Sequence, residues 1–116
     1  YLQHRDNKKY IHYPNKWSFF GGEQKKNESS KKCLSRELNE EISFDICKPI
    51  LISKWFNSET EINITFFLIK TKKMIDFVVS EGQKGKWIKI DKLNKLDLAP
   101  DVQYINSLIK YQKFDI

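Results

Sequence analysis

The sequence predicts a mixed α/β fold, in which helices cover a sheet whose strands do not all run in one direction. The predicted elements follow the order strands, helix, strands, helix, and several strands are joined by short hairpin-like loops. That order differs from the regular strand–helix alternation of a doubly wound parallel sheet. A chain of 116 residues, 40% of them hydrophobic, has room for one packed core. We therefore expect a single domain over residues 1–116.

The chain opens within an expected strand, at residues 1–5. Because the first residue is tyrosine, we expect this first strand to be incomplete at its N-terminal end. A polar loop containing Pro14 follows. Residues 17–20, "WSFF", predict a short aromatic strand that ends at Gly21 and Gly22, where the backbone can turn freely.

The first helix is expected to run to about Glu41. Ser29 or Ser30 can cap its N-terminus, and Asn27 in the preceding loop can adopt a left-handed conformation. Further strands are indicated by β-branched and aromatic residues at 49–56, 62–70, 74–79 and 86–90. A closing helix is expected from Asp101 to Tyr111, because Pro100 favours the first turn of a helix.

Composition limits the classes of protein to consider. The formal net charge of +6 comes mostly from scattered lysines, which are typical of a solvated surface, so we do not expect a nucleic-acid partner. No apolar run approaches the ~20 residues that span a bilayer, so we expect no membrane partner and a cytoplasmic location. Cys33 and Cys47 are expected to be reduced thiols rather than a disulfide.

Three glutamates are concentrated on the first predicted helix. Glu37, Glu40 and Glu41 fall within about 100° of a helical wheel. The adjoining arc holds the apolar residues Leu34, Leu38 and Ile42. Like charges at these spacings repel by a few tenths of a kcal/mol per pair, and a divalent cation such as Mg²⁺ or Mn²⁺ would relieve that repulsion. The alternative is an ordinary amphipathic helix with a solvated acidic side.

The surrounding sequence has a longer pattern. Gly22 is followed by five residues and Glu28, then by seven residues and the run 36–44, "RELNEEISF". This pattern closely resembles the Nudix box: Gly, five residues, Glu, seven residues, Arg-Glu, an aliphatic, any residue, Glu-Glu, any residue, Gly, an aliphatic. The one departure at a fixed position is Ser43, where the family has glycine, and Phe44 stands for the final aliphatic residue.

The resemblance implies an α/β/α sandwich with a mixed sheet between helices, and hydrolysis of a nucleoside diphosphate linked to another group. It implies that Glu37, Glu40 and Glu41 bind Mg²⁺ or Mn²⁺, with one of them positioning the attacking water. Glu28 would support this cluster, and Arg36 would orient its carboxylates by ion pairing.

The resemblance extends outside the box. It implies that the carbonyl group of Gly21 or Gly22 joins the metal ligands. Glu81, in "SEGQKGKWIKI", matches a glutamate that approaches the metals in MutT-type members, although it also fits a surface loop. Arg5 matches a position that contacts substrate phosphates, although a surface charge is the alternative.

The base pocket is harder to predict. Asp101 lies where MutT-type members place an amide that reads an oxidised purine, although it also suits a helix cap. Phe19, like Trp17 and Tyr104, has a ring that can stack on a base or pack in the core.

The first hypothesis is a Mg²⁺-dependent enzyme that cleaves a nucleoside triphosphate into a monophosphate and pyrophosphate, with 8-oxo-dGTP as a candidate substrate. The alternatives are a nucleotide-sugar hydrolase and a catalytically weak module that binds nucleotides or RNA. The resemblance leaves a monomer and a homodimer open.

Overall fold

The computed structural model describes residues 1–8, 10–79 and 84–111, which form two compact units. Unit 1 takes its described residues from 1–19 and 84–111, and unit 2 takes its described residues from 20–79. A single domain over the whole chain stays a prediction.

Unit 1 contains a three-stranded antiparallel sheet. Its central strand is β1 (Leu2–His4), which pairs with β2 (Trp17–Ser18) on one side and β5 (Lys84–Lys86) on the other. Trp17 also forms a parallel bridge with Leu98, and its N–H donates to the carbonyl of Asp97 at 2.9 Å. These bonds attach the segment before the last helix to the edge of the sheet.

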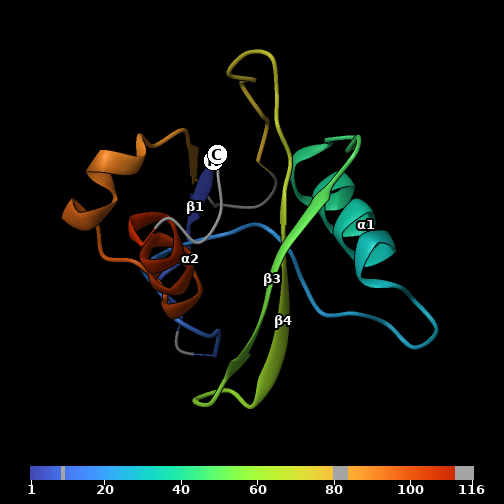
Figure 1. Ribbon diagram of the computed structural model, residues 1–116, viewed down its shortest axis with the longest axis horizontal. Coiled ribbons are helices and arrows are strands. Elements are labelled where there is room, and N and C mark those ends of the chain that lie inside the picture. The colour runs from blue at the N-terminus through green and yellow to red at the C-terminus, as the bar shows by residue number, and fades with distance from the viewer. Residues whose placement is uncertain (9, 80–83, 112–116) are drawn as a thin grey trace. The chain divides into compact units, whose positions relative to one another are not determined.

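The helices of unit 1 are the 3₁₀ helix η1 (Ile90–Lys95) and α2 (Pro100–Lys110). Proline at the first position of α2 costs no hydrogen bond, because that N–H would have no partner within the helix. The core of the unit is formed by Leu2, Leu93, Leu98 and Val102, with Trp17, Phe19, Ile88 and Leu96 packed against it. Figure 1 shows α2 beside β1, in the part of the molecule that this core holds together.

Unit 2 contains α1 (Ser30–Ile42) and a hairpin of β3 (Ile50–Asn57) and β4 (Ile62–Leu68). The hydroxyl group of Ser29 accepts from the N–H of Lys32 at 3.1 Å, so Ser29 is the helix cap. Figure 1 shows the hairpin as the two long strands of the molecule.

Two residues next to α1 adopt left-handed backbone conformations. Asn27 has a φ of 64°, as predicted for the loop before the helix. Ser43 has a φ of 52°, and its N–H donates to the carbonyl of Asn39 at 3.0 Å. Ser43 therefore occupies the left-handed position after a helix end that glycine takes most easily.

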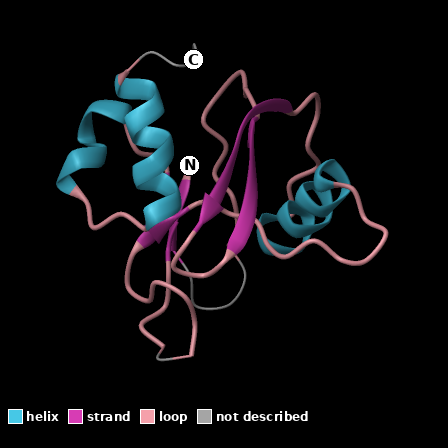
Figure 2. Cartoon of the chain, turned by 60° about the horizontal axis from the view of Figure 1, so that its bottom comes forward, coloured by secondary structure: helices cyan, strands magenta, loops and turns pink. Residues whose placement is uncertain are grey.

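Two strand predictions were wrong. Residues 74–79 form no strand, as Figure 2 shows by a loop after β4. Within unit 2, β3 and β4 use each other as hydrogen-bonding partners, and residues 74–79 pair with neither, so their apolar residues alone do not make a strand. The strand predicted at 86–90 lies earlier, at Lys84–Lys86. Its three residues pair with the three residues of β1, and the pairing ends where Lys86 meets Leu2, the first residue of β1. Ile90 instead begins η1.

Two observations bear on the other sequence predictions. Cys33 and Cys47 are both free thiols, Cys33 buried and Cys47 exposed, as predicted. Within the described residues, none of the helices combines the length and the apolar character that crossing a membrane requires.

Candidate active site

Arg36 lies at the centre of the acidic cluster of unit 2. Its Nε donates to Oε2 of Glu28 at 2.8 Å, and its Nη2 donates to Oε1 of the same carboxylate at 3.0 Å. Its Nη1 donates to Oε1 of Glu37 at 2.8 Å and lies 3.6 Å from Oε2 of Glu40. One guanidinium group thus joins the loop before α1 to two carboxylates on the helix, and its fork holds Glu28 in two-point contact.

The central pairs are largely shielded from water. The side chains of Glu28, Glu37 and Arg36 are 14%, 17% and 21% exposed. The Arg36 guanidinium, by hydrogen bonding, lowers the pKa of Glu28 to about 2, and the N–H of Lys25 adds to that effect. The same ion pair raises the pKa of Arg36. Glu28 and Arg36 are therefore both charged at neutral pH, and each fixes the other.

The glycine pair packs directly against α1. The N–H of Gly21 donates to Oε1 of Glu41 at 3.1 Å, and Gly21 has a φ of 152°, which side chains rarely allow. A Cβ atom added at Gly22 would overlap the carboxylate of Glu37. The thiol of Cys33 lies 3.6 Å from the carbonyl oxygen of Gly22 and donates to it. The backbone conformation favours glycine at Gly21, and a side chain at Gly22 would displace the carboxylate of Glu37. The glycine pair thus brings the backbone against two carboxylates of α1.

The loop between Gly22 and α1 is held by hydrogen bonds to Glu28. The N–H of Lys25 donates to Oε1 of Glu28 at 3.0 Å, and the amide of Gln24 donates to the carbonyl oxygen of Glu28. Because Glu28 also binds Arg36, the loop and the helix form one hydrogen-bonded structure.

The donor atoms of the cluster suit a hard divalent cation. Glu37, Glu40 and Glu41 offer carboxylate oxygens and Gly22 a carbonyl oxygen, the ligand type that Mg²⁺ and Mn²⁺ prefer. The described residues contain no group of three acidic, histidine or cysteine side chains gathered closely enough to hold an ion. Instead, Glu37 binds Arg36, and Glu41 accepts from Gly21. The donor set fits such a cation by its chemistry, and metal binding stays a prediction. Glu81, the other predicted ligand, lies outside the described residues.

Unit 1 holds the three residues predicted to bind substrate. The carboxylate of Asp101 accepts from the N–H of Val102 at 2.8 Å and also from the N–H of Phe19. Burial raises the pKa of Asp101, while these N–H groups and the charge of Arg5 oppose that rise. The ring of Phe19 packs against the core of unit 1, which is the alternative to stacking on a base. Asp101 is not the helix cap: Ala99 occupies that position without a side-chain cap hydrogen bond, and Asp101 lies inside the first turn of α2.

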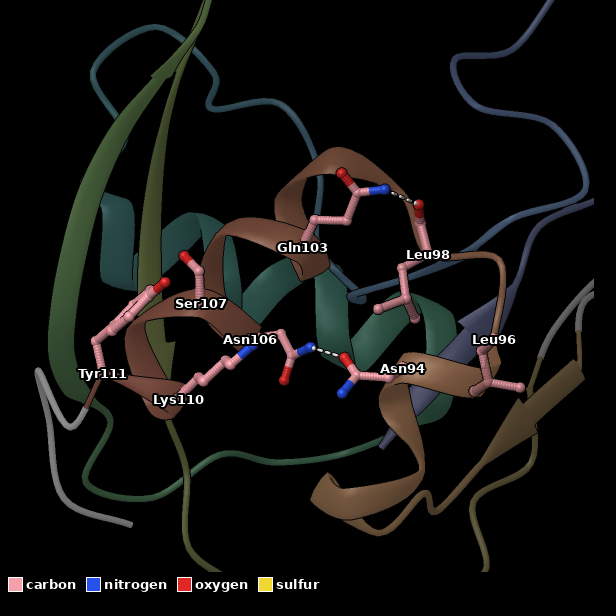
Figure 3. A pocket seen from close by; sticks show the side chains of 8 residues that line it. All are labelled: Asn94, Leu96, Leu98, Gln103, Asn106, Ser107, Lys110 and Tyr111. Carbon is pink, nitrogen blue, oxygen red and sulfur yellow. Dashed lines mark hydrogen bonds between the residues drawn. The ribbon is translucent and has the colours of Figure 1, made fainter.

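A hollow of about 350 Å³ lies along η1 and α2 in unit 1. Figure 3 shows hydrogen bonds within its lining: the Asn106 amide donates to Asn94 at 3.0 Å, and the Gln103 amide donates to the carbonyl of Leu98 at 3.0 Å. None of the predicted site residues lines it.

Comparison with known proteins identifies the class of protein. Residues 1–108 match the NUDIX domain model, so the chain belongs to the Nudix family of pyrophosphohydrolases. A MutT structure, from a study of MutT from Aliivibrio salmonicida and Vibrio cholerae, aligns with a TM-score of 0.77 and 22% identity, over 96% of this chain and 84% of that one. The MutT protein from Methanosarcina mazei Go1 aligns with a TM-score of 0.73 and 18% identity, over 98% and 85% of the two chains. None of the curated proteins matches this chain.

The family match and the structural likeness confirm the predicted mixed α/β Nudix fold. The roles predicted for individual residues are not tested by either. Sequence reasoning missed the contact of Cys33 with Gly22, although Cys33 lies three and four residues before Arg36 and Glu37 and so shares their helix face.

Proposed function

We propose that this Nudix hydrolase cleaves nucleoside triphosphates to a nucleoside monophosphate and pyrophosphate in a Mg²⁺-dependent reaction. The observation that carries the proposal is the Arg36-centred cluster, in which Glu28, Glu37 and Glu40 surround one guanidinium group on the Nudix helix. In the reaction, a water oxygen bonds to phosphorus, the bond from that phosphorus to the bridging oxygen breaks, and pyrophosphate leaves.

The residues of the cluster divide into two roles. Arg36 and Glu28 are positioning residues, since their two-point ion pair fixes the loop against the helix and holds Glu37 at 2.8 Å. Glu37, Glu40 and Glu41, together with the carbonyl of Gly22, are the groups that would hold the cation. Glu41 and Glu37 are kept in place by hydrogen bonds from Gly21 and Arg36, respectively.

A bound Mg²⁺ or Mn²⁺ would neutralise phosphate oxygens and lower the pKa of a coordinated water. The carboxylates would supply the negative charge that holds such a cation, and one of them would accept the proton that the attacking water loses. Arg5 and Asp101 are proposed to contact the substrate, as the Nudix resemblance implies.

The choice among substrates rests on the MutT likeness. Two structures described as MutT proteins share this fold at 22% and 18% identity, which supports a triphosphate substrate and makes 8-oxo-dGTP the first oxidised nucleotide to test.

The test is an assay of product identity. The protein is incubated with Mg²⁺ and, separately, with triphosphates, 8-oxo-dGTP, nucleotide sugars and dinucleoside polyphosphates. Pyrophosphate released from a triphosphate supports the proposal. Sugar phosphate released from a nucleotide sugar would replace it with the nucleotide-sugar alternative, and binding without hydrolysis would favour the catalytically weak module.

A matched pair of variants tests the cluster itself. Glu40 is the most exposed of the three carboxylates beside Arg36. Glu40→Gln removes its charge, and we expect kcat to fall by about a hundredfold or more. Glu59→Gln removes the same charge from the exposed loop between β3 and β4, and we expect activity to be unchanged. Full activity in the Glu40 variant would show that the assigned cation ligands are wrong.

A further inference from the structure

Cys33 is a buried thiol at the junction between α1 and the loop that precedes it. It lies in the second turn of α1 and is 6% exposed. Its Sγ donates to the carbonyl oxygen of Gly22 at 3.6 Å and accepts from Nη2 of Arg36 at 3.8 Å. The thiol therefore joins the glycine pair to the arginine at the centre of the acidic cluster.

Side chains of α1 bind two consecutive carbonyl groups of the loop. Cys33 binds the carbonyl of Gly22, and Nη2 of Arg36 donates to the carbonyl of Glu23 at 3.1 Å. Cys33 and Arg36 are three residues apart, so they lie on the same face of the helix. The two peptide groups share the Cα atom of Glu23, so binding both carbonyls restricts rotation of the backbone at that point.

The Gly22 carbonyl needs such a contact to keep one direction. Glycine has more backbone freedom than any other residue, so its own conformation does not fix the carbonyl. A stiffer residue does not fit there, because a Cβ atom at Gly22 would overlap the carboxylate of Glu37. The direction of the carbonyl is therefore set from outside, by Cys33.

The bond to Cys33 leaves the carbonyl oxygen able to accept a second partner. A backbone carbonyl oxygen has two lone pairs, and an S–H group is a weak donor. Cys33 thus orients the oxygen while occupying only one lone pair. The oxygen remains the hard type of ligand that Mg²⁺ and Mn²⁺ prefer, and the carboxylate of Glu37 lies against the same glycine.

The role of this thiol is not contained in the Nudix pattern. Position 33 is one of the seven residues that the pattern leaves open between Glu28 and Arg36. The other cysteine of the chain, Cys47, is exposed and also belongs to unit 2. The two thiols therefore form a natural comparison.

We propose that Cys33 is a positioning residue, whose S–H group orients the Gly22 carbonyl for the cation and whose sulfur couples that carbonyl to Arg36. The inference rests on the proposed function and adds a residue to the groups that would prepare its cation site. Groups that orient a metal ligand commonly change metal affinity tenfold or more when they are removed. We expect a smaller effect here, because an S–H bond is weak.

The experiment compares three variants. Cys33→Ala removes the donor, Cys33→Ser keeps a donor, and Cys47→Ala is the matched control that removes the exposed thiol of the same unit. The measurement is the Kd of Mn²⁺ for each protein without nucleotide, by electron paramagnetic resonance. The Tm of each protein without metal records its stability separately.

We expect Cys33→Ala to weaken Mn²⁺ binding about threefold to fivefold, the effect of losing one modest hydrogen bond. Cys33→Ser should restore most of the affinity, and Cys47→Ala should leave it unchanged. A thiol that only fills space would lower the Tm of Cys33→Ala with no change in the Kd of Mn²⁺, and that result would overturn the inference. So would a serine variant that binds Mn²⁺ as weakly as the alanine variant.

Infrared spectroscopy provides a second test in which Cys33 itself is retained. In Cys47→Ser, Cys33 is the one remaining thiol of the sequence, so the S–H stretching band reports on it alone. When the Gly22 carbonyl binds a cation, its oxygen accepts the S–H bond less strongly, and the band moves to higher frequency. We expect this shift on addition of Mg²⁺. A band that does not move at saturating Mg²⁺ would overturn the inference, even if Cys33→Ala does not fold.

Failure of this inference and failure of the proposed function give different results. Mn²⁺ binding that depends on Cys33, without hydrolysis of any triphosphate, would support the role of Cys33 and overturn the proposed reaction. Triphosphate hydrolysis with an unchanged Kd of Mn²⁺ in Cys33→Ala would do the reverse. A wild-type protein that binds no Mn²⁺ would overturn both.

Discussion

At the scale of single residues, Ser43 shows how a departure from the Nudix pattern is accommodated. The backbone after α1 keeps the left-handed turn, with a φ of 52°, although the residue has a side chain. A left-handed conformation costs a residue with a Cβ roughly 1–2 kcal/mol. The departure therefore affects stability at the helix end, whereas the carboxylates of α1 stay in contact with Arg36 and Gly21.

We predict that Ser43→Gly raises the free energy of unfolding by about 1 kcal/mol, because glycine adopts the left-handed conformation without this cost. The matched control is Ser35→Gly, within α1, which should lower the free energy of unfolding by about 0.5–1 kcal/mol. Urea denaturation measures both changes. A loss of stability in Ser43→Gly would mean that serine makes a contact there that outweighs the backbone cost.

At the scale of elements, the ion pair of Glu28 and Arg36 joins a loop to a helix, and it makes that junction sensitive to acid. The pKa of Glu28 is lowered from an ordinary value of 4.5 to about 2 in the folded protein. Between these values the unfolded chain binds more protons than the folded one, so the contribution of this carboxylate is full above about pH 4.5 and is lost as the pH falls towards 2.

We predict that the difference in unfolding free energy between wild type and Glu28→Gln is largest above pH 5 and shrinks steadily as the pH falls below about 4.5, the ordinary pKa of the carboxyl group. Denaturant titrations from pH 6 to pH 2.5 measure this difference. Glu59→Gln, which removes an exposed carboxylate far along the chain, controls for the loss of one charge. A difference between wild type and Glu28→Gln that stays constant with pH would contradict the assigned ion pair.

The helices and strands also show which local sequence patterns are sufficient to predict secondary structure. The helix at Ser30–Ile42 was predictable, because its cap and its apolar spacing are local features. The apolar residues at 74–79 resembled a strand equally well, but Met74 and Val78 are 75% and 81% exposed. A helix satisfies its own hydrogen bonds, whereas a strand depends on a partner that the local sequence does not reveal.

At the scale of the whole molecule, family membership predicts a coupling between cation binding and stability. Any ligand that binds the folded state alone stabilises it, by about 2.7 kcal/mol at a hundred times its Kd. The carboxylates of Glu37 and Glu41 are held by Arg36 and by the N–H of Gly21, respectively. A cation bound by these carboxylates would add its binding free energy to the stability of the folded state.

We predict that millimolar Mg²⁺ raises the Tm of the wild-type protein and that EDTA reverses the shift. Glu40→Gln should reduce or abolish the shift, whereas Glu59→Gln should retain it. Thermal scans at constant ionic strength separate specific binding from general screening of charge. An equal shift in the wild type and both variants would indicate that the ion acts elsewhere.

The sequence by itself determined the Nudix assignment and the helix that carries the glutamates, since both depend on residue types at fixed spacings along one continuous stretch. It also placed Glu28 and Arg36 in the cluster, through the same pattern. Only the tertiary structure decided that Gly22 lies against Glu37 and that Cys33 binds the Gly22 carbonyl. These contacts form between segments that are separate in the sequence and approach one another only in the folded chain. The spacing of residues within one segment therefore does not reveal them.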